Sequence, residues 1–61
     1  MDMQYLKTYC SEKIKQYPQY KPDILDFYQL CRDEIEEGGS EAHEVRLCIN
    51  DIENLIKGEE I

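Results

Sequence analysis

Residues 35–45, IEEGGSEAHEV, contain the strongest turn signal in this 61-residue chain. Gly38 and Gly39 supply a left-handed stop of the kind that ends a helix, and Ser40 is a natural N-cap for a following helix. Position 43 holds His43 in place of the Glu or Gln of a full capping box. A loop this short between two apolar helical patterns predicts an antiparallel helical hairpin.

The rest of the chain also carries a helical pattern. Apolar residues recur every three or four positions, and no stretch alternates with the period of two that indicates a strand. Tyr17 precedes Pro18 and so ends the first helix, because the residue before a proline is pushed out of the α region. Gly58 is placed to end the last helix. We expect one all-α domain over residues 1–61, in which the first helix folds across the hairpin. The predicted helices cover about residues 2–17, 22–37 and 41–57.

Two of the predicted helices carry strong apolar stripes. Leu25 and Leu30 are expected to widen the stripe of the second helix, whose centre consists of Ile24, Phe27, Tyr28, Cys31 and Ile35. The stripe of the third helix spans two heptads, which is wider than a hairpin partner alone needs. A core of this size rarely supplies more than about 3–5 kcal/mol, so the surplus width predicts a homodimer in which hairpins pack into a bundle. The predicted oligomer seam consists of Val45, Cys48, Ile49, Ile52, Leu55 and Ile56.

The charge of the chain is strongly negative and unevenly placed. Seven basic side chains stand against fourteen acidic ones, and the net charge of −7 opposes direct binding to nucleic acid phosphates. Residues 1–22 hold four lysines against two carboxylates, whereas residues 23–61 hold three basic side chains against twelve carboxylates.

Six of these carboxylates crowd the predicted hairpin tip, where Glu36 and Glu37 end a helix and oppose its macrodipole. Because carboxylates at this place weaken the end of the helix, their presence indicates a function, namely an anionic surface that binds a basic protein partner. The alternative interpretation is a solvated tip that only keeps a small protein soluble. The predicted acidic face consists of Asp33, Glu34, Glu36, Glu37, Glu41 and Glu44.

Four of the five tyrosines lie in the first third of the chain. Tyrosine gives a large contact area at an interface for little lost rotamer freedom, so these residues form a second predicted partner-binding face. The alternative is that their rings cover a small core or the dimer seam. The residues are Tyr5, Tyr9, Tyr17 and Tyr20.

The chain lacks the motifs that support catalysis or metal binding. Cys10, Cys31 and Cys48 are an odd number of cysteines without a CxxC pair, which predicts free, buried thiols in a reducing compartment. The lone His43 is interpreted as a surface side chain. No Gly-rich phosphate loop, nucleophile elbow or H-E-x-x-H helix occurs. We therefore expect no independent enzyme activity, no metal and no cofactor.

The location of the protein is predicted from two further features. No apolar run approaches the roughly 18 residues of a membrane span. The N-terminal segment MDMQYLKTYC lacks the basic start and apolar stretch of a signal peptide. We therefore expect a cytoplasmic protein without membrane contact.

Residues 49–56, INDIENLI, carry a resemblance to a known family. Amide, acid, aliphatic and acid side chains follow the order of the Ser-Gln-Glu-Leu-Asp motif of the small helical-hairpin aspartyl-phosphate phosphatases of sporulation phosphorelays, with Ile49 at the serine position. Residues 32–56 as a whole resemble the hairpin of that family. The resemblance implies a partner-dependent phosphatase acting on a response regulator, with Asn50 and Asp51 facing the phosphorylated partner.

Small size, acidity and the lack of a catalytic set favour a non-catalytic protein-binding regulator or inhibitor. Phages and mobile elements encode compact proteins of this kind against host or defence enzymes. The protein would occupy a functional surface of its partner, either as an acidic mimic of nucleic acid or by docking an aromatic or apolar helix face into a groove. The hairpin phosphatase is the first alternative, and an oligomer that sequesters a small ligand is the second.

Overall fold

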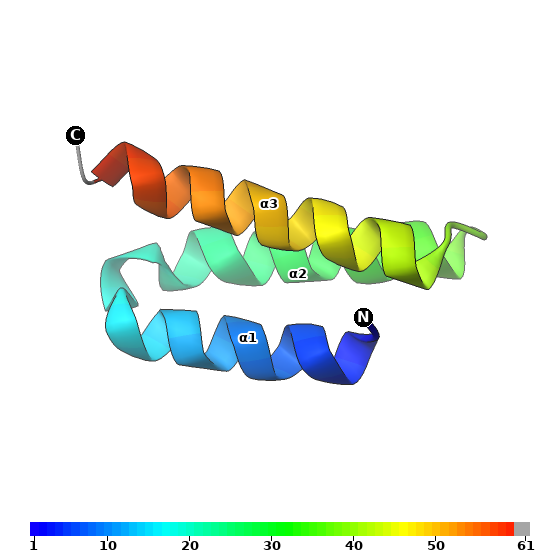
Figure 1. The fold of residues 1–61 in the computed structure, drawn as a ribbon, viewed down its shortest axis with the longest axis horizontal. Helices are drawn as coiled ribbons and strands as arrows, with labels where there is room; N and C mark the ends of the chain where they lie inside the picture. The colour runs from blue at the N-terminus through cyan, green and yellow to red at the C-terminus, as the bar shows by residue number, and fades with distance from the viewer. Residues whose placement is uncertain (60–61) are drawn as a thin grey trace.

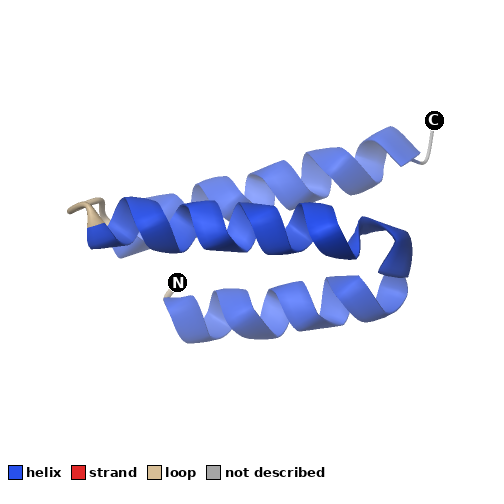
Figure 2. Cartoon of the chain, turned by 180° about the vertical axis from the view of Figure 1, so that it is seen from behind, coloured by secondary structure: helices blue, strands red, loops and turns tan. Residues whose placement is uncertain are grey.

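The computed structural model describes residues 1–59, and three helices make up most of them. Residues 60 and 61, the end of the predicted domain, lie outside the described part. In Figure 1, α2 lies between α1 and α3 and runs antiparallel to both, and Figure 2 shows α2 from the opposite side. The all-α fold with a hairpin of the second and third helices is confirmed. The elements are α1 (Met3–Gln16), the 3₁₀ turn η1 (Pro18–Tyr20), α2 (Lys21–Glu36) and α3 (Glu41–Glu59).

Two carboxylates fix the start of α1. Asp2 is the N-cap, and its Oδ1 accepts a hydrogen bond from the backbone N–H of Tyr5 at 2.9 Å. The Oε2 of Glu41, at the start of α3, accepts from the backbone N–H of Met3 at 3.0 Å. The first N–H groups of a helix have no partner inside the helix and need such acceptors. The second bond therefore also ties the N-terminal ends of α1 and α3 together.

The glycine pair folds α3 back onto α2. Gly38 has a φ of +106°, a conformation that residues with a side chain rarely adopt. The N–H groups of Gly38 and Gly39 donate to carbonyls in the last turn of α2, at 3.0 and 2.9 Å, and so satisfy acceptors that the helix end leaves free. The hydroxyl of Ser40 accepts from the N–H of His43 at 3.4 Å, as the predicted N-cap requires.

The prediction that Gly58 ends the third helix is wrong. Among the described glycines only Gly38 has a positive φ, and α3 continues through Gly58 to Glu59. A glycine ends a helix where the chain turns into the left-handed region, and no such turn occurs at Gly58.

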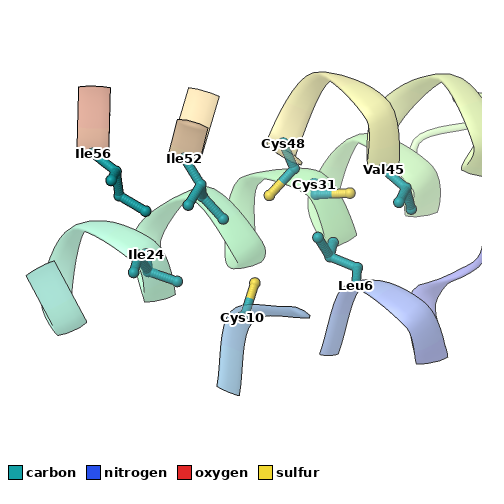
Figure 3. Close-up of a cluster of buried hydrophobic side chains, with 8 residues drawn as sticks. All are labelled: Leu6, Cys10, Ile24, Cys31, Val45, Cys48, Ile52 and Ile56. Atoms are coloured by element: carbon teal, nitrogen blue, oxygen red, sulfur yellow. The ribbon is translucent and has the colours of Figure 1, made fainter. Parts of the chain in front are cut away.

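The core is small and lies where the three helices meet (Figure 3). Each helix contributes one cysteine to it, and the prediction of free, buried thiols is confirmed. Within residues 1–58 no polar or charged side chain is buried. The eight buried residues are Leu6, Cys10, Ile24, Cys31, Val45, Cys48, Ile52 and Ile56.

Two leucines that were expected to widen the apolar stripe of the second helix lie on the surface instead. Leu25 is 46% exposed and Leu30 is 55% exposed. Successive residues of a helix differ by about 100° around its axis, which places these leucines on opposite flanks of the line through Ile24 and Cys31. Only the residues at the centre of the stripe pack into the core, so the leucines on its two flanks remain exposed.

Most of the predicted oligomer seam lies inside the chain itself. Its half-buried members are Ile49 and Leu55. The homodimer stays a prediction, because contacts with α1 and α2 already use much of the apolar width of α3. The buried members of the seam are Val45, Cys48, Ile52 and Ile56.

Replacing Gly38 or Gly39 with alanine is expected to destabilise the hairpin. Alanine at position 38 is strained at a φ of +106°, and a Cβ at position 39 would lie 2.8 Å from the carbonyl oxygen of Glu34. We expect each substitution to lower the free energy of unfolding by about 1–2 kcal/mol. Urea denaturation followed by circular dichroism measures this loss.

Gly58→Ala is the matched control for these two variants. A Cβ at position 58 meets nothing within 4 Å, and alanine is the better helix former, so stability should stay the same or rise slightly. If the free energy of unfolding fell equally in all three variants, Gly38 and Gly39 would have no special role in the turn, and the prediction would be contradicted.

Candidate functional site

The six carboxylates of the predicted acidic face lie around the turn between α2 and α3. Glu44 is half-buried, and the other five are exposed. Two of these five make hydrogen bonds: Glu41 accepts from the N–H of Met3, and the Oδ1 of Asp33 accepts from the Nε2 of Gln29, both at 3.0 Å. The remaining exposed carboxylates are Glu34, Glu36 and Glu37.

Glu36 and Glu37 lie at the least favourable place on α2 for a negative charge. Glu36 is the last residue of the helix and Glu37 is its C-cap. The free carbonyls at a helix C-terminus carry partial negative charge, so a carboxylate there costs about 0.3–1 kcal/mol at low salt. No basic residue lies in the last turn of α2 to compensate.

The basic side chains at the opposite end of the bundle follow the helix dipole. Lys13 and Lys15 lie in the last turn of α1, and Lys57 lies in the last turn of α3. Cations at these positions are stabilising. The end of α2 has two carboxylates and no basic residue, whereas the end of α1 has two lysines and the end of α3 has Lys57 beside Glu59. The fold alone does not explain the acidic end of α2.

The four tyrosines fall into two pairs: Tyr5 and Tyr9 line one groove on α1, and Tyr17 and Tyr20 lie at the turn between α1 and α2. Tyr5 is 52% exposed. Tyr9 packs partly against the core, and burial, followed by the charge of Glu53, raises its pKa. Tyr17 directly precedes η1 and Tyr20 is its last residue; their ring centroids are 6.3 Å apart, and both also pack against the core. Three of the four rings therefore cover the small core, and Tyr5 is the exposed one.

The three thiols lie among the aliphatic side chains of the core (Figure 3). The Sγ of Cys31 donates to the Sδ of Met3 at 3.9 Å. Burial, followed by the charge of Glu44, raises the pKa of Cys31. The hydrogen bond between Cys10 and Cys48 lowers the pKa of Cys10 against the effect of burial. The same bond, together with burial, raises the pKa of Cys48.

These thiols have the environment of core side chains and not of reactive groups. All three are buried, and cysteine in such a place behaves as a small hydrophobe. Within residues 1–59 no group of three or more histidine, cysteine, aspartate or glutamate side chains is arranged to hold a metal ion.

Asn50 and Asp51, the residues indicated by the phosphatase resemblance, are both exposed on α3. Successive residues on a helix point about 100° apart, so the two side chains project in different directions from α3.

Sequence reasoning missed the exposure of two leucines. Leu30, predicted to widen the apolar stripe of the second helix, is 55% exposed, and Leu47, which is not among the predicted site residues, is 45% exposed. The exposure of Leu47 could have been predicted from the sequence, because Leu47 is not part of the apolar stripe in which Val45, Cys48 and Ile52 follow one another at spacings of three and four.

No protein-family model, curated protein or solved structure matches this chain. None of the helices within residues 1–59 has both the length and the apolar composition needed to cross a membrane. What the protein does is therefore inferred from its own residues.

The raised pKa of Cys31 predicts a loss of stability in alkaline solution. The thiol ionises near its usual value of 9.0 in the unfolded chain and stays protonated to higher pH in the folded one. Above pH 9.0 the unfolded state therefore binds fewer protons than the folded state. The contribution of Cys31 is therefore complete below about pH 8 and is lost as the pH rises through 9 toward the folded-state pKa. Urea unfolding from about pH 7 to pH 10 measures the decline.

Cys31→Ala is the control for this effect. This variant should be less stable at neutral pH, because it leaves a small cavity, but its stability should decline less steeply above about pH 9. An equally steep decline in both proteins would assign the effect to other groups and contradict the prediction.

Proposed function

We propose that this protein is a small, non-catalytic regulator or inhibitor that binds another protein, of the kind that phages and mobile elements direct against host or defence enzymes. It places its acidic hairpin end on a basic functional surface of the partner. There the carboxylates take the positions that phosphates of a nucleic acid otherwise occupy. Binding of this kind blocks the surface without any reaction.

The observation that carries the proposal is the position of Glu36 and Glu37 against the dipole of α2. Lysine at either position would stabilise the helix end, so the carboxylates reduce stability relative to a simple alternative. The core does not require them, since every buried side chain within residues 1–58 is apolar or a cysteine. Residues that lower stability without a structural purpose are typical of binding sites.

Charge reversal at the tip should abolish partner binding and at the same time stabilise the protein. In Glu36→Lys with Glu37→Lys, the anionic surface is lost and the dipole interaction becomes favourable, by about 0.3–1 kcal/mol per side chain at low salt. The binding test is an affinity pull-down from a bacterial lysate with washes at low and high salt. Mass spectrometry identifies the retained proteins.

The matched control is Glu12→Lys with Asp26→Lys, which changes the net charge by the same amount at two exposed positions away from the tip. We expect the wild type and this control to retain the same basic partner at low salt and to release it at high salt, because salt screens exposed charges. Retention of that partner by the tip variant would contradict the proposal.

The hairpin phosphatase is a second candidate, favoured by the antiparallel α2–α3 pair and by the exposure of Asn50 and Asp51. A phosphatase accelerates the release of inorganic phosphate from a phosphorylated response regulator, and Asp51→Ala should remove the acceleration. The non-catalytic regulator predicts release at the spontaneous rate with either protein. This assay therefore separates the two functions.

A further inference from the structure

Leu30 and Leu47 lie on the side of the α2–α3 hairpin that is turned away from α1. The side that meets α1 is defined by its grooves: Leu25 and Tyr28 line the groove between α1 and α2, and Glu53 lines the groove between α1 and α3. At about 100° per residue, Leu30 lies roughly 140° around α2 from Leu25, and Leu47 lies roughly 120° around α3 from Glu53. Both leucines therefore face away from α1.

The two leucines also lie at a similar height along the hairpin. Each directly precedes a core cysteine, Cys31 on α2 and Cys48 on α3. These cysteines belong to one core cluster and are close enough for the charge of Cys31 to affect the pKa of Cys48 (Figure 3). Leu30 and Leu47 thus form an exposed apolar pair across the two helices.

Carboxylates surround this pair. On α2, Asp23 lies seven residues before Leu30 and Glu34 lies four residues after it. On α3, Glu44 lies three residues before Leu47 and Asp51 lies four residues after it. Residues at these spacings share one side of a helix. We call this surface the hairpin face, and it consists of Asp23, Leu30, Glu34, Glu44, Leu47 and Asp51.

The basic side chains of the hairpin lie on the other flank. Arg32 and Lys57 line grooves beside α1. Lys21 lies seven residues before Tyr28, and Arg46 lies seven residues before Glu53, so both share the flank that meets α1. The hairpin face therefore combines exposed leucines with negative charge alone.

We infer that the hairpin face binds one basic amphipathic helix of the partner protein. This inference rests on the proposed function and names the element of the partner that is recognised. Apolar side chains of that helix would pack between Leu30 and Leu47, and its lysines or arginines would meet the surrounding carboxylates. A helix of about 18 residues is roughly 27 Å long. It matches α2 and α3, which have 16 and 19 residues, and takes the fourth position of a four-helix bundle.

Charge selects this occupant over others. A second copy of the chain bound face to face would bring carboxylates against carboxylates, which costs free energy. Nucleic acids and anionic lipid surfaces carry the same sign of charge as the face and are repelled. A basic helix satisfies both the apolar pair and the carboxylates around it.

The test uses a synthetic helix of about 18 leucine and lysine residues, with leucine at every third or fourth position and blocked ends. A scrambled peptide of the same composition is the peptide control. Calorimetric titration compares the wild type with Leu30→Gln/Leu47→Gln and with Leu25→Gln. Leu25→Gln removes a leucine of similar exposure, 46% against 55% for Leu30 and 45% for Leu47, from the opposite flank of α2 without changing the net charge. Circular dichroism confirms that each variant is folded.

We expect the wild type to bind the amphipathic peptide more tightly than the scrambled one. The double variant should bind it about tenfold more weakly, because apolar contact area is lost, and Leu25→Gln should stay within about twofold of the wild type. Equal binding by all three proteins, or no binding by the wild type, would overturn the inference. The inference would also be overturned if the wild type sedimented as a dimer and the double variant as a monomer, because the hairpin face would then bind a second copy of the chain.

Failure of this inference is distinguishable from failure of the proposed function. If the peptide does not bind while the pull-down still shows a salt-sensitive partner that the tip variant loses, the acidic end acts without the hairpin face. If the tip variant keeps its partner, the proposed function fails whatever the peptide does.

Discussion

Leu6, Ile24, Val45 and Ile52 have no exposed surface, and together with four further buried residues they form the row of side chains that holds the three helices together (Figure 3). They come from all three helices, so no helix can leave without exposing side chains of the other two. The remaining buried residues are the three cysteines and Ile56, and no polar side chain among residues 1–58 is buried with them. Because this core uses so few residues, the positions of charged side chains are largely free of structural demands.

That freedom makes the acidic end informative. A charged residue that satisfies a buried partner or caps a helix has a structural explanation, as Asp2 does at the start of α1 and Glu41 does for Met3. Glu36 and Glu37 have no such explanation and oppose the dipole of α2. The interaction of charges with helix ends thus explains Asp2 and Glu41 as parts of the fold. It leaves Glu36 and Glu37 as the carboxylates for which we propose a binding function.

Local signals in the sequence were sufficient to predict the fold, but they were not sufficient to predict which residues are exposed. Gly38, Gly39 and Pro18 mark the helix ends, since each acts on its own backbone. The exposure of Leu30 depends instead on which flank of α2 the first helix covers, and apolar periodicity alone does not determine that choice. The acidic residues of the tip could be predicted because they need no tertiary contact to lie beside the turn. The leucines of the hairpin face could not.

In the proposed complex, the acidic end and the hairpin face have different roles in recognition. Exposed carboxylates attract any cationic surface over about 8–10 Å, so by themselves they speed association but discriminate poorly. Leu30 and Leu47 act only at contact, and only a helix with apolar side chains at matching spacing can cover both. The carboxylates then discriminate among such helices by repelling acidic ones. Selectivity in so small a protein therefore depends on placing both kinds of residue on one surface, and the α2–α3 hairpin does this because Glu34 and Glu44 belong to the acidic end as well as to the hairpin face.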